Sequence, residues 1–331
     1  MPITSIQPVS SKGLQPSTPP EKQASSSAPQ ALFEKIVLKA NKGLPTDQNG
    51  NPIDLRGCVA ITQDAKHQGW LHKVMWLAQR IHTFILGRWK CDSTFCHGMI
   101  ILDRDRTGRK GKEDNLIVAH SVLDGIHTSS CNYLKEKHVT GLVVYRPVDP
   151  KLRELLIKHG NRTAYTDPRF QTDPSATDYK VQKAGFSFFD FISSCFRNLF
   201  SAPSNITKKH TARIVADLLM DNQILDSKGK KPHAFFCMPY VMSVLQGSML
   251  IQALSDEDKK ALLVDEQGKP KSRKALAKAI YSKIKKKDNA DALSRAYWDS
   301  KICQQNARYI TSCYAAKELD KVSTPFAVVQ S

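Results

Sequence analysis

The distribution of apolar and polar residues predicts a run of β-strands in the first half of the chain. Short apolar stretches alternate there with segments rich in glycine, proline and charged residues, which is typical of strands joined by turns. The pair Asp124 and Gly125 is a strong turn signal and predicts a hairpin between the strands on either side. The predicted strands cover residues 57–62, 97–102, 115–121 and 139–146.

Apolar residues recur at helical spacing in other parts of the chain. Ser255 and Asp258 form a capping box that opens a helix. Residues 186–200 carry an aromatic stripe opposite a polar face, which favours a packed helix; an interfacial helix or an active-site lid is the alternative. Further helices are predicted at residues 31–40, 70–86, 149–159, 206–219, 271–287 and 288–319. A helix followed by an antiparallel sheet, in this order, indicates an α+β fold.

Cys237 is the most informative candidate for chemistry, because it lies where an apolar lead-in gives way to a helix. Pro239 fits only the first turn of a helix, where the N–H group that proline lacks has no partner in any case. The helix therefore begins at about Cys237. Backbone N–H groups and the helix dipole stabilise a thiolate at such a position and could hold an oxyanion. The pattern favours a nucleophile; the alternative is a buried apolar thiol.

Two histidines are candidates to activate this thiol. His97 opens a predicted strand and His120 lies on the next one, so antiparallel pairing could bring the two imidazoles side by side. We expect His97 to act as the base and His120 to fix its tautomer; the alternative for His97 is a core histidine. His127 is an alternative to His120. His233 is a competing base for Cys237, although its lead-in strand should point it away.

These residues resemble the circularly permuted papain-like hydrolases, which include the permuted NlpC-type peptidases and the lecithin–retinol acyltransferase group. In that superfamily the histidine strand precedes the cysteine helix, and the third polar residue lies on the strand after the histidine. That residue is often glutamate in the bacterial peptidases and histidine in the acyltransferases. The resemblance covers roughly residues 55–246 and rests on GCVAIT at 57–62, CHGMIIL at 96–102, IVAHS at 117–121, VYR at 144–146 and FC at 236–237.

The resemblance implies a permuted papain-like fold, with an antiparallel sheet packed on helices. It also implies a thiol hydrolase or acyltransferase that acts on an amide or ester through Cys237, His97 and His120. The substrate would be a peptide, an isopeptide or a lipid acyl group, and no cofactor is expected. The chain departs from the family at Cys58, where an aspartate is usual, and at Met238, where a small or polar residue is usual. A catalytically lapsed binding module is therefore the alternative.

Three regions are expected along the chain. Residues 1–30 are rich in Ser and Pro and poor in large apolar residues, so they should be disordered. Residues 31–254 would form the papain-like catalytic domain, with an insertion at about 160–205. Residues 255–331 would add a basic helical region at the C-terminus.

The formal net charge of +18 favours anionic partners. Much of this charge lies late in the chain, where residues 271–287 form a basic helix with an apolar edge made by Leu276, Ala279, Ile280 and Ile284. The simplest interpretation is a solvated helix; docking to an anionic membrane or an acidic protein is the alternative. Nucleic acid fits less well, because no aromatic platform or groove-reading motif is present.

The eight cysteines include no C-x-x-C pair and no Cys/His cluster with zinc-ligand spacing. We therefore expect reduced thiols, no metal site and a cytoplasmic protein. The start of the chain lacks the basic and apolar regions of a Sec-type signal, and no apolar run is long enough to span a membrane. A start rich in Ser and Pro would also suit an effector exported by a specialised bacterial secretion system.

Overall fold

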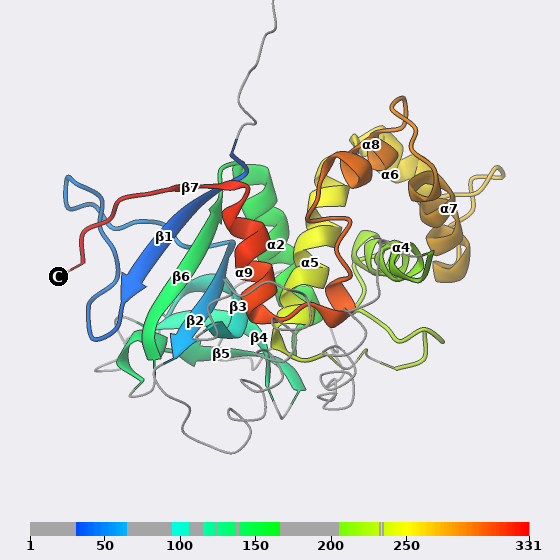
Figure 1. Ribbon diagram of the computed structural model, residues 1–331. Helices are drawn as coiled ribbons and strands as arrows, with labels where there is room; N and C mark the ends of the chain where they lie inside the picture. The colour runs from blue at the N-terminus through cyan, green and yellow to red at the C-terminus, as the bar shows by residue number, and fades with distance from the viewer. Residues whose placement is uncertain are drawn as a thin grey trace, which may run out of the picture. The chain divides into compact units, whose positions relative to one another are not determined.

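In the computed structural model, the described residues form an α+β fold in which a seven-stranded, mostly antiparallel sheet packs against seven α-helices (Figure 1). The structure describes residues 31–64, 95–105, 115–122, 125–136, 139–165, 205–231, 233 and 235–330. The sheet order is β5-β4-β3-β2-β6-β1-β7. The α+β prediction is confirmed; the papain-like topology and the division at about residue 255 stay predictions.

The strand predictions are confirmed, and the structure adds strands that the pattern did not show. The hairpin predicted around Gly125 joins β4 to β5, and Gly125 has a positive φ of 112°, which glycine adopts readily. Neighbouring strands are antiparallel except β1 and β7, which are parallel. The strands are β1 (Phe33–Lys39), β2 (Cys58–Asp64), β3 (Phe95–Arg104), β4 (Leu116–Val122), β5 (Gly125–Cys131), β6 (Val139–Pro147) and β7 (Ser323–Pro325).

The helix predicted at residues 31–40 is wrong, because this segment forms β1. Ile36 and Leu38 are buried on one face of the sheet, and Phe33 is buried on the other. Strand β6 pairs with the whole length of β1, and β7 pairs with its first residues. Pairing on both edges and burial on both faces decide the conformation here, because strand formation depends strongly on tertiary context.

The helices largely follow the sequence pattern, and the capping box of Ser255 is confirmed. The single helix predicted at 288–319 is wrong: it is two helices with a short 3-10 turn between them, and Asp291 and Thr311 cap the two new starts. The predictions at 70–86 and 186–200 lie outside the described residues, as does the segment 1–30. The helices are α2 (Pro150–Thr163), α4 (Asn205–Leu219), α5 (Cys237–Gln252), α6 (Asp256–Leu263), α7 (Arg273–Lys285), α8 (Ala292–Asp299) and α9 (Ser312–Asp320).

Apolar cores form on both faces of the sheet. Helices α2, α5 and α9 cover one face, and α4, α6, α7 and α8 lie beyond α5 (Figure 1). The helix-side core includes Ile100 and Leu102 of β3 together with Val241 of α5. The opposite core includes the alternate β3 residues Met99 and Ile101. Strand β3 is therefore buried on both faces, which fixes the direction of each of its side chains.

The last helix and strand return to the sheet. The hydroxyl of Tyr145 on β6 donates to the carbonyl of Ala316 at 3.2 Å and to a carboxylate oxygen of Asp320 at 2.9 Å. Lys35 of β1 also forms an ion pair with Asp320 at 2.8 Å. These contacts hold α9 against the sheet. Within the described residues no single helix has the length and apolar composition to cross a membrane, although α5 and α6, bent by 110°, meet both criteria as a pair.

Candidate active site

Helix α5 begins at Cys237, as the position of Pro239 predicts. Phe236 is the N-cap residue and makes no side-chain capping bond. Proline is tolerated in the first turn because the missing N–H group would have no partner within the helix. The thiol therefore lies at the end of α5 where the backbone N–H groups point outward.

The sulfur of Cys237 is surrounded by hydrogen-bond donors. The backbone N–H groups of Gly98 and Met238 and the hydroxyl of Ser312 hydrogen-bond it. The residue is only 5% exposed, and this burial raises the pKa of the thiol more than the hydrogen bonds lower it. The thiolate expected from the helix start is therefore not the resting form, and the thiol needs a base to remove its proton.

Gly98 allows β3 and the start of α5 to approach closely. A Cβ atom on Gly98 would lie 2.5 Å from the Sδ atom of Met238. Met238 is fully buried, so its side chain has little room to move away. The lack of a side chain at Gly98 thus lets the strand backbone reach the sulfur of Cys237.

The structure brings His97 and His120 together, as strand pairing predicts. Met99 of β3 pairs with His120 of β4, and His97, two residues before Met99, projects from the same face. The Nε2 atom of His97 lies 2.9 Å from the Nδ1 atom of His120. The backbone N–H of His97 donates to the hydroxyl of Thr62 at 3.1 Å, which anchors the start of the pair.

His120 is buried among further hydrogen-bonding groups. Its Nε2 atom lies 2.8 Å from the Ser129 hydroxyl, and its Nδ1 atom lies 2.8 Å from the Tyr133 hydroxyl. Burial, reinforced by the neighbouring His97 and His127, holds the pKa of His120 well below its usual value of 6.5. His120 is therefore a neutral imidazole at neutral pH, with one N–H donor and one acceptor nitrogen.

Sequence reasoning missed the polar residues that follow His127 on β5. Ser129 lies 3.0 Å from the sulfur of Cys131, and both side chains share a strand face with His127. The alternation of His127, Ser129 and Cys131 was a usable signal for a polar strand face. Tyr133 gave no such signal. The pKa of its hydroxyl is raised by burial and by its neighbours, among them Cys131 and Cys237, so Tyr133 contacts His120 and also lies near the thiol.

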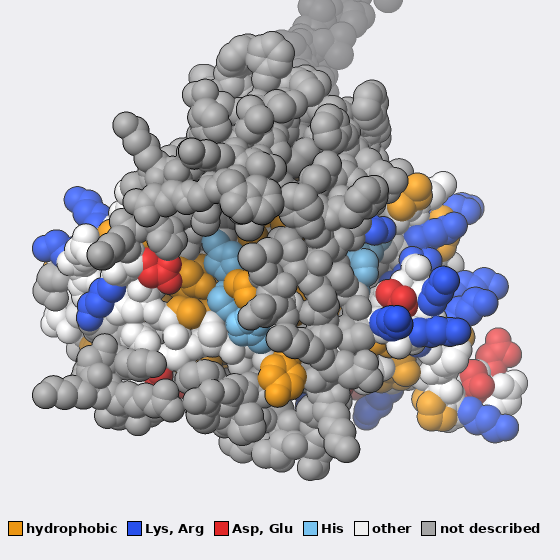
Figure 2. Space-filling view, turned by 90° about the horizontal axis from the view of Figure 1, so that it is seen from below, with side chains coloured by type: hydrophobic (Ala, Val, Ile, Leu, Met, Phe, Trp, Pro, Cys, Tyr) orange, Lys and Arg blue, Asp and Glu red, His pale blue; other side chains and the backbone are white. Residues whose placement is uncertain are grey.

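His127 and His233, the alternatives to His120 and His97, lie in different parts of the structure. The ring of His127 lies 5.0 Å from the ring of His120, measured between centroids, so it belongs to the same cluster. The ring of His233 instead packs edge-on against Phe235 at 4.3 Å and lies 5.7 Å from the ring of His210. The described residues here, 231, 233, 235 and 236, are not in a strand, contrary to the expected lead-in strand. Figure 2 shows histidine side chains gathered in the middle of one face, and Lys and Arg side chains over the helices to one side.

The C-terminal part of the chain contributes Ser312, which no sequence pattern indicated. Ser312 is the first residue of α9, and Thr311 is the N-cap of this helix.

The neighbouring Cys313 is disulfide-bonded, so the expectation of reduced thiols throughout is wrong. Cysteine spacing could not show this, because pairing depends on which segments the fold brings together. Cys58, Cys131, Cys237 and Cys303 are free thiols.

The catalytic roles of Cys237, His97 and His120 stay predictions, although the structure places all three on adjoining elements. No group of three or more His, Cys, Asp or Glu side chains is arranged to hold a metal ion in the part of the chain that is described. No protein-family model matches the chain, and neither the curated proteins nor the solved structures include one that matches it.

Proposed function

We propose that the protein is a thiol hydrolase or acyltransferase of the permuted papain-like type. The observation that carries this proposal is the contact between His97 of β3 and His120 of β4. Gly98, the residue after His97 on β3, hydrogen-bonds the sulfur of Cys237. A nucleophile, a base and a group that orients the base are the minimum that such chemistry needs.

The protonation of the histidine pair suits this role. When the Nδ1 atom of neutral His120 accepts the Nε2–H of His97, the lone pair of His97 is on Nδ1. His120 then donates its own Nε2–H to Ser129, which lies 2.8 Å away. His97 in this tautomer takes the thiol proton through Nδ1, and the imidazolium that forms is stabilised by His120.

The reaction then follows from the electronic requirements of acyl transfer. The thiolate of Cys237 attacks the carbonyl carbon, a C–S bond forms, and the carbonyl electron pair moves to oxygen. The backbone N–H of Cys237, at the start of α5, contributes to stabilising this oxyanion. His97 returns the proton to the leaving alcohol or amine as the C–O or C–N bond breaks, which leaves a thioester. Water or an amine then resolves the thioester. The family resemblance supports an amide or ester substrate: a peptide, an isopeptide or a lipid acyl group.

Acyl-enzyme trapping tests this proposal. The purified protein is mixed with p-nitrophenyl esters of short and long acyl chains, and the acylated residue is located by peptide mass spectrometry. We expect acylation of Cys237 and loss of it in Cys237→Ala. His97→Ala should slow acylation by roughly 100-fold or more, the usual contribution of a general base.

Cys303 offers a matched control, because it is also a buried free thiol at 1% exposure. Cys303→Ser should acylate at the unchanged rate. Equal acylation of several cysteines, or an unchanged rate in His97→Ala with its thermal unfolding also unchanged, would rule out the mechanism.

Because Cys237 is buried and its thiol pKa is raised, a second candidate function is favoured: a papain-like scaffold that binds a partner without turnover. It predicts no acyl-enzyme with any ester and equal partner binding by wild type and Cys237→Ala. Acylation of Cys237 that depends on His97 would exclude this candidate.

A further inference from the structure

A basic cavity lies between α4 and the segment that leads into α5. It has a volume of about 240 Å³ and is lined by His210 and Arg213 of α4, His233, and Arg308 of the 3-10 turn. None of these residues belongs to the candidate active site.

A second, larger hollow adjoins the cavity. It has a volume of about 540 Å³ and shares Arg213 and Ser227 with the first. Lysines from three segments line it: Lys209 of α4, Lys228 of the following loop, and Lys274 and Lys278 of α7. Since Arg213 and Ser227 line both, the two hollows adjoin, and together they are called the basic depression.

The positive charge in this depression has little internal compensation. Asp226 is the only acidic residue lining either hollow in the described part of the chain. Its carboxylate already accepts the backbone N–H groups of Lys228 at 3.1 Å and Lys230 at 3.0 Å. Arg273 is paired with the buried Asp217 at 2.8 Å, so it holds the loop in place. Arg213, Lys274 and Lys278 form no ion pair with a described residue, so their charge can attract an external anion.

His210 lines the inner cavity. Its Nε2 atom is buried and has no hydrogen-bond partner among the described atoms. Burial and the neighbouring His233, Arg308 and Arg213 lower the pKa of His210 to about 3, so the ring is neutral and one of its nitrogens is a donor. In the tautomer with the proton on Nε2, this buried donor lacks a partner, which is costly, and an anionic oxygen in the cavity would satisfy it.

We propose that this depression binds a small ligand carrying several phosphate groups. Arg213 and His210 would hold one phosphate in the inner cavity, since the arginine fork matches phosphate oxygens and histidine adds a donor. Lys209, Lys274 and Lys278 would hold further phosphates in the outer hollow. Two adjoining hollows lined mainly by cations favour a multiply phosphorylated ligand over a single phosphate.

The shape of the site distinguishes it from general docking to an anionic membrane. The apolar edge of α7 is not available for insertion into lipid, because Leu276, Ile280 and Ile284 are fully buried. The cavity is small and is lined by basic side chains from α4 and from the 3-10 turn, which suits a compact phosphorylated ring. Such a ring could be a soluble inositol polyphosphate or the headgroup of a phosphoinositide, and the experiment separates the two.

Calorimetric titration of the full chain with inositol hexakisphosphate and with pyrophosphate, at physiological salt, tests the proposal. Saturable binding at one site is expected, with tighter binding of the hexakisphosphate. Arg213→Gln and the double variant Lys274→Gln/Lys278→Gln should each weaken binding by roughly tenfold or more, the usual effect of losing charged hydrogen bonds. Because both lysines are exposed, the double variant tests the site even if Arg213→Gln fails to fold.

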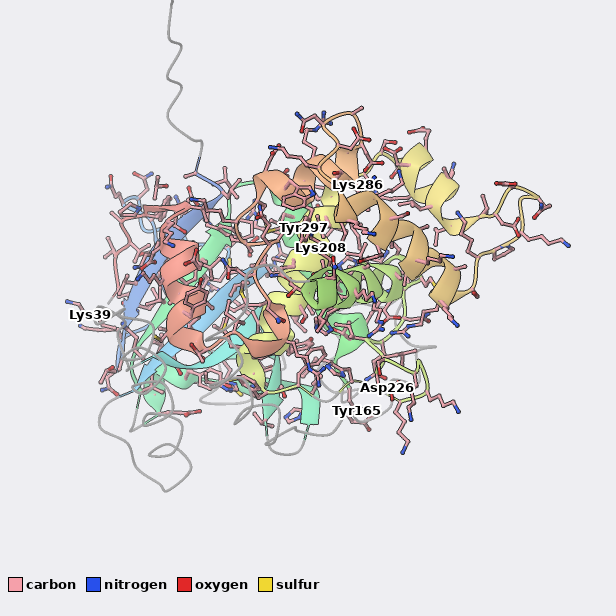
Figure 3. All side chains as sticks on the ribbon, turned by 45° about the vertical axis from the view of Figure 1, so that its right-hand side comes forward. Lys39, Tyr165, Lys208, Asp226, Lys286 and Tyr297 are labelled. Atoms are coloured by element: carbon pink, nitrogen blue, oxygen red, sulfur yellow. The ribbon has the colours of Figure 1, made fainter. Side chains whose placement is uncertain are left out.

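Lys286→Gln/Lys287→Gln is the matched control, since it removes the same charge from exposed residues that line neither hollow. Figure 3 shows Lys286 at the opposite end of the helical part from Asp226, which lines the cavity. The control should bind like wild type. Equal weakening in control and site variants, or no saturable binding, would overturn the proposal.

Two further measurements identify the source of the ligand and separate this site from the active site. Vesicles containing phosphatidylinositol bisphosphate should compete with the soluble ligand if the site accepts a headgroup; without competition the ligand is a soluble polyphosphate. Equal binding to phosphatidylserine vesicles in all variants would indicate only a general anionic surface and would count against the site. Cys237→Ala should bind normally, so this proposal stands or fails independently of catalysis.

Discussion

The backbone N–H of Gly98 hydrogen-bonds the sulfur of Cys237. Gly98 directly follows His97 in the chain, so the strand that carries the candidate base also holds the candidate nucleophile. This contact requires strand β3 and the start of α5 to lie closer than two ordinary side chains would allow.

Replacing Gly98 should therefore displace the nucleophile. A Cβ atom in Gly98→Ala would meet the Sδ atom of Met238 at 2.5 Å. We expect a loss of about 1–3 kcal/mol in the free energy of unfolding, as for other overpacked cores, measured by urea denaturation. In a double-mutant cycle, Met238→Ala should relieve part of this loss. If the two losses simply add, the close approach to Met238 is not their cause.

The raised pKa of Cys237 predicts slow alkylation at neutral pH. Only the thiolate reacts, and burial keeps the thiol protonated above its ordinary pKa of 9.0. The rate of iodoacetamide labelling at Cys237, followed by mass spectrometry, should keep rising as the pH passes 9. A plateau below neutral pH would instead reveal a preformed thiolate–imidazolium pair and would contradict the protonated resting state.

The hydroxyl of Ser312, near the C-terminus, should lower the pKa of the Cys237 thiol. This hydroxyl hydrogen-bonds the sulfur of Cys237, and hydrogen bonds to a thiolate stabilise it. Ser312→Ala should raise the thiol pKa further and slow acylation several-fold, since one hydrogen bond is worth about 1 kcal/mol. Ser323→Ala, which removes a hydroxyl that donates to Leu319 at 2.7 Å, should leave the rate unchanged. Equal slowing in both variants would point to α9 packing rather than the hydroxyl.

The lowered pKa of the buried His159 predicts that the protein loses stability as the pH falls. Burial lowers the pKa of His159 to about 3 from 6.5, so in this range the unfolded chain binds a proton that the folded chain does not. The contribution of His159 to the free energy of unfolding is constant above about pH 6.5. Below that pH it falls by up to about 1.4 kcal/mol per pH unit. Urea unfolding between pH 7 and pH 4.5 should show a smaller slope in His159→Gln. The same slope in both proteins would contradict the assignment.

The sequence was informative where a local rule decides the structure. Pro239 located the start of α5 at Cys237, and Ser255 located the start of α6, because both depend on the N–H groups of one helical turn. Strand alternation placed His97 and His120 on neighbouring strands, and the register then brought them into contact.

Long-range contacts decided the features that sequence reasoning missed. Residues 33–39 became a strand because β6 and β7 pair with them from distant parts of the chain. Tyr133 and Ser312 reach the site through the packing of a short 3-10 helix (Tyr133–Lys135) and of α9, which no periodicity encodes. The disulfide at Cys313 likewise depends on which segments meet in the fold.

The return of α9 and β7 to the sheet has a consequence for biosynthesis. His97, His120 and Cys237 leave the ribosome well before Ser312, and the parallel pairing of β7 with β1 joins the earliest described strand to the last. A nascent chain that has just released α5 therefore holds its thiol without the hydroxyl that α9 supplies. The complete environment of the sulfur forms only after translation of α9, which would delay any reactivity that depends on this contact until the late stages of folding.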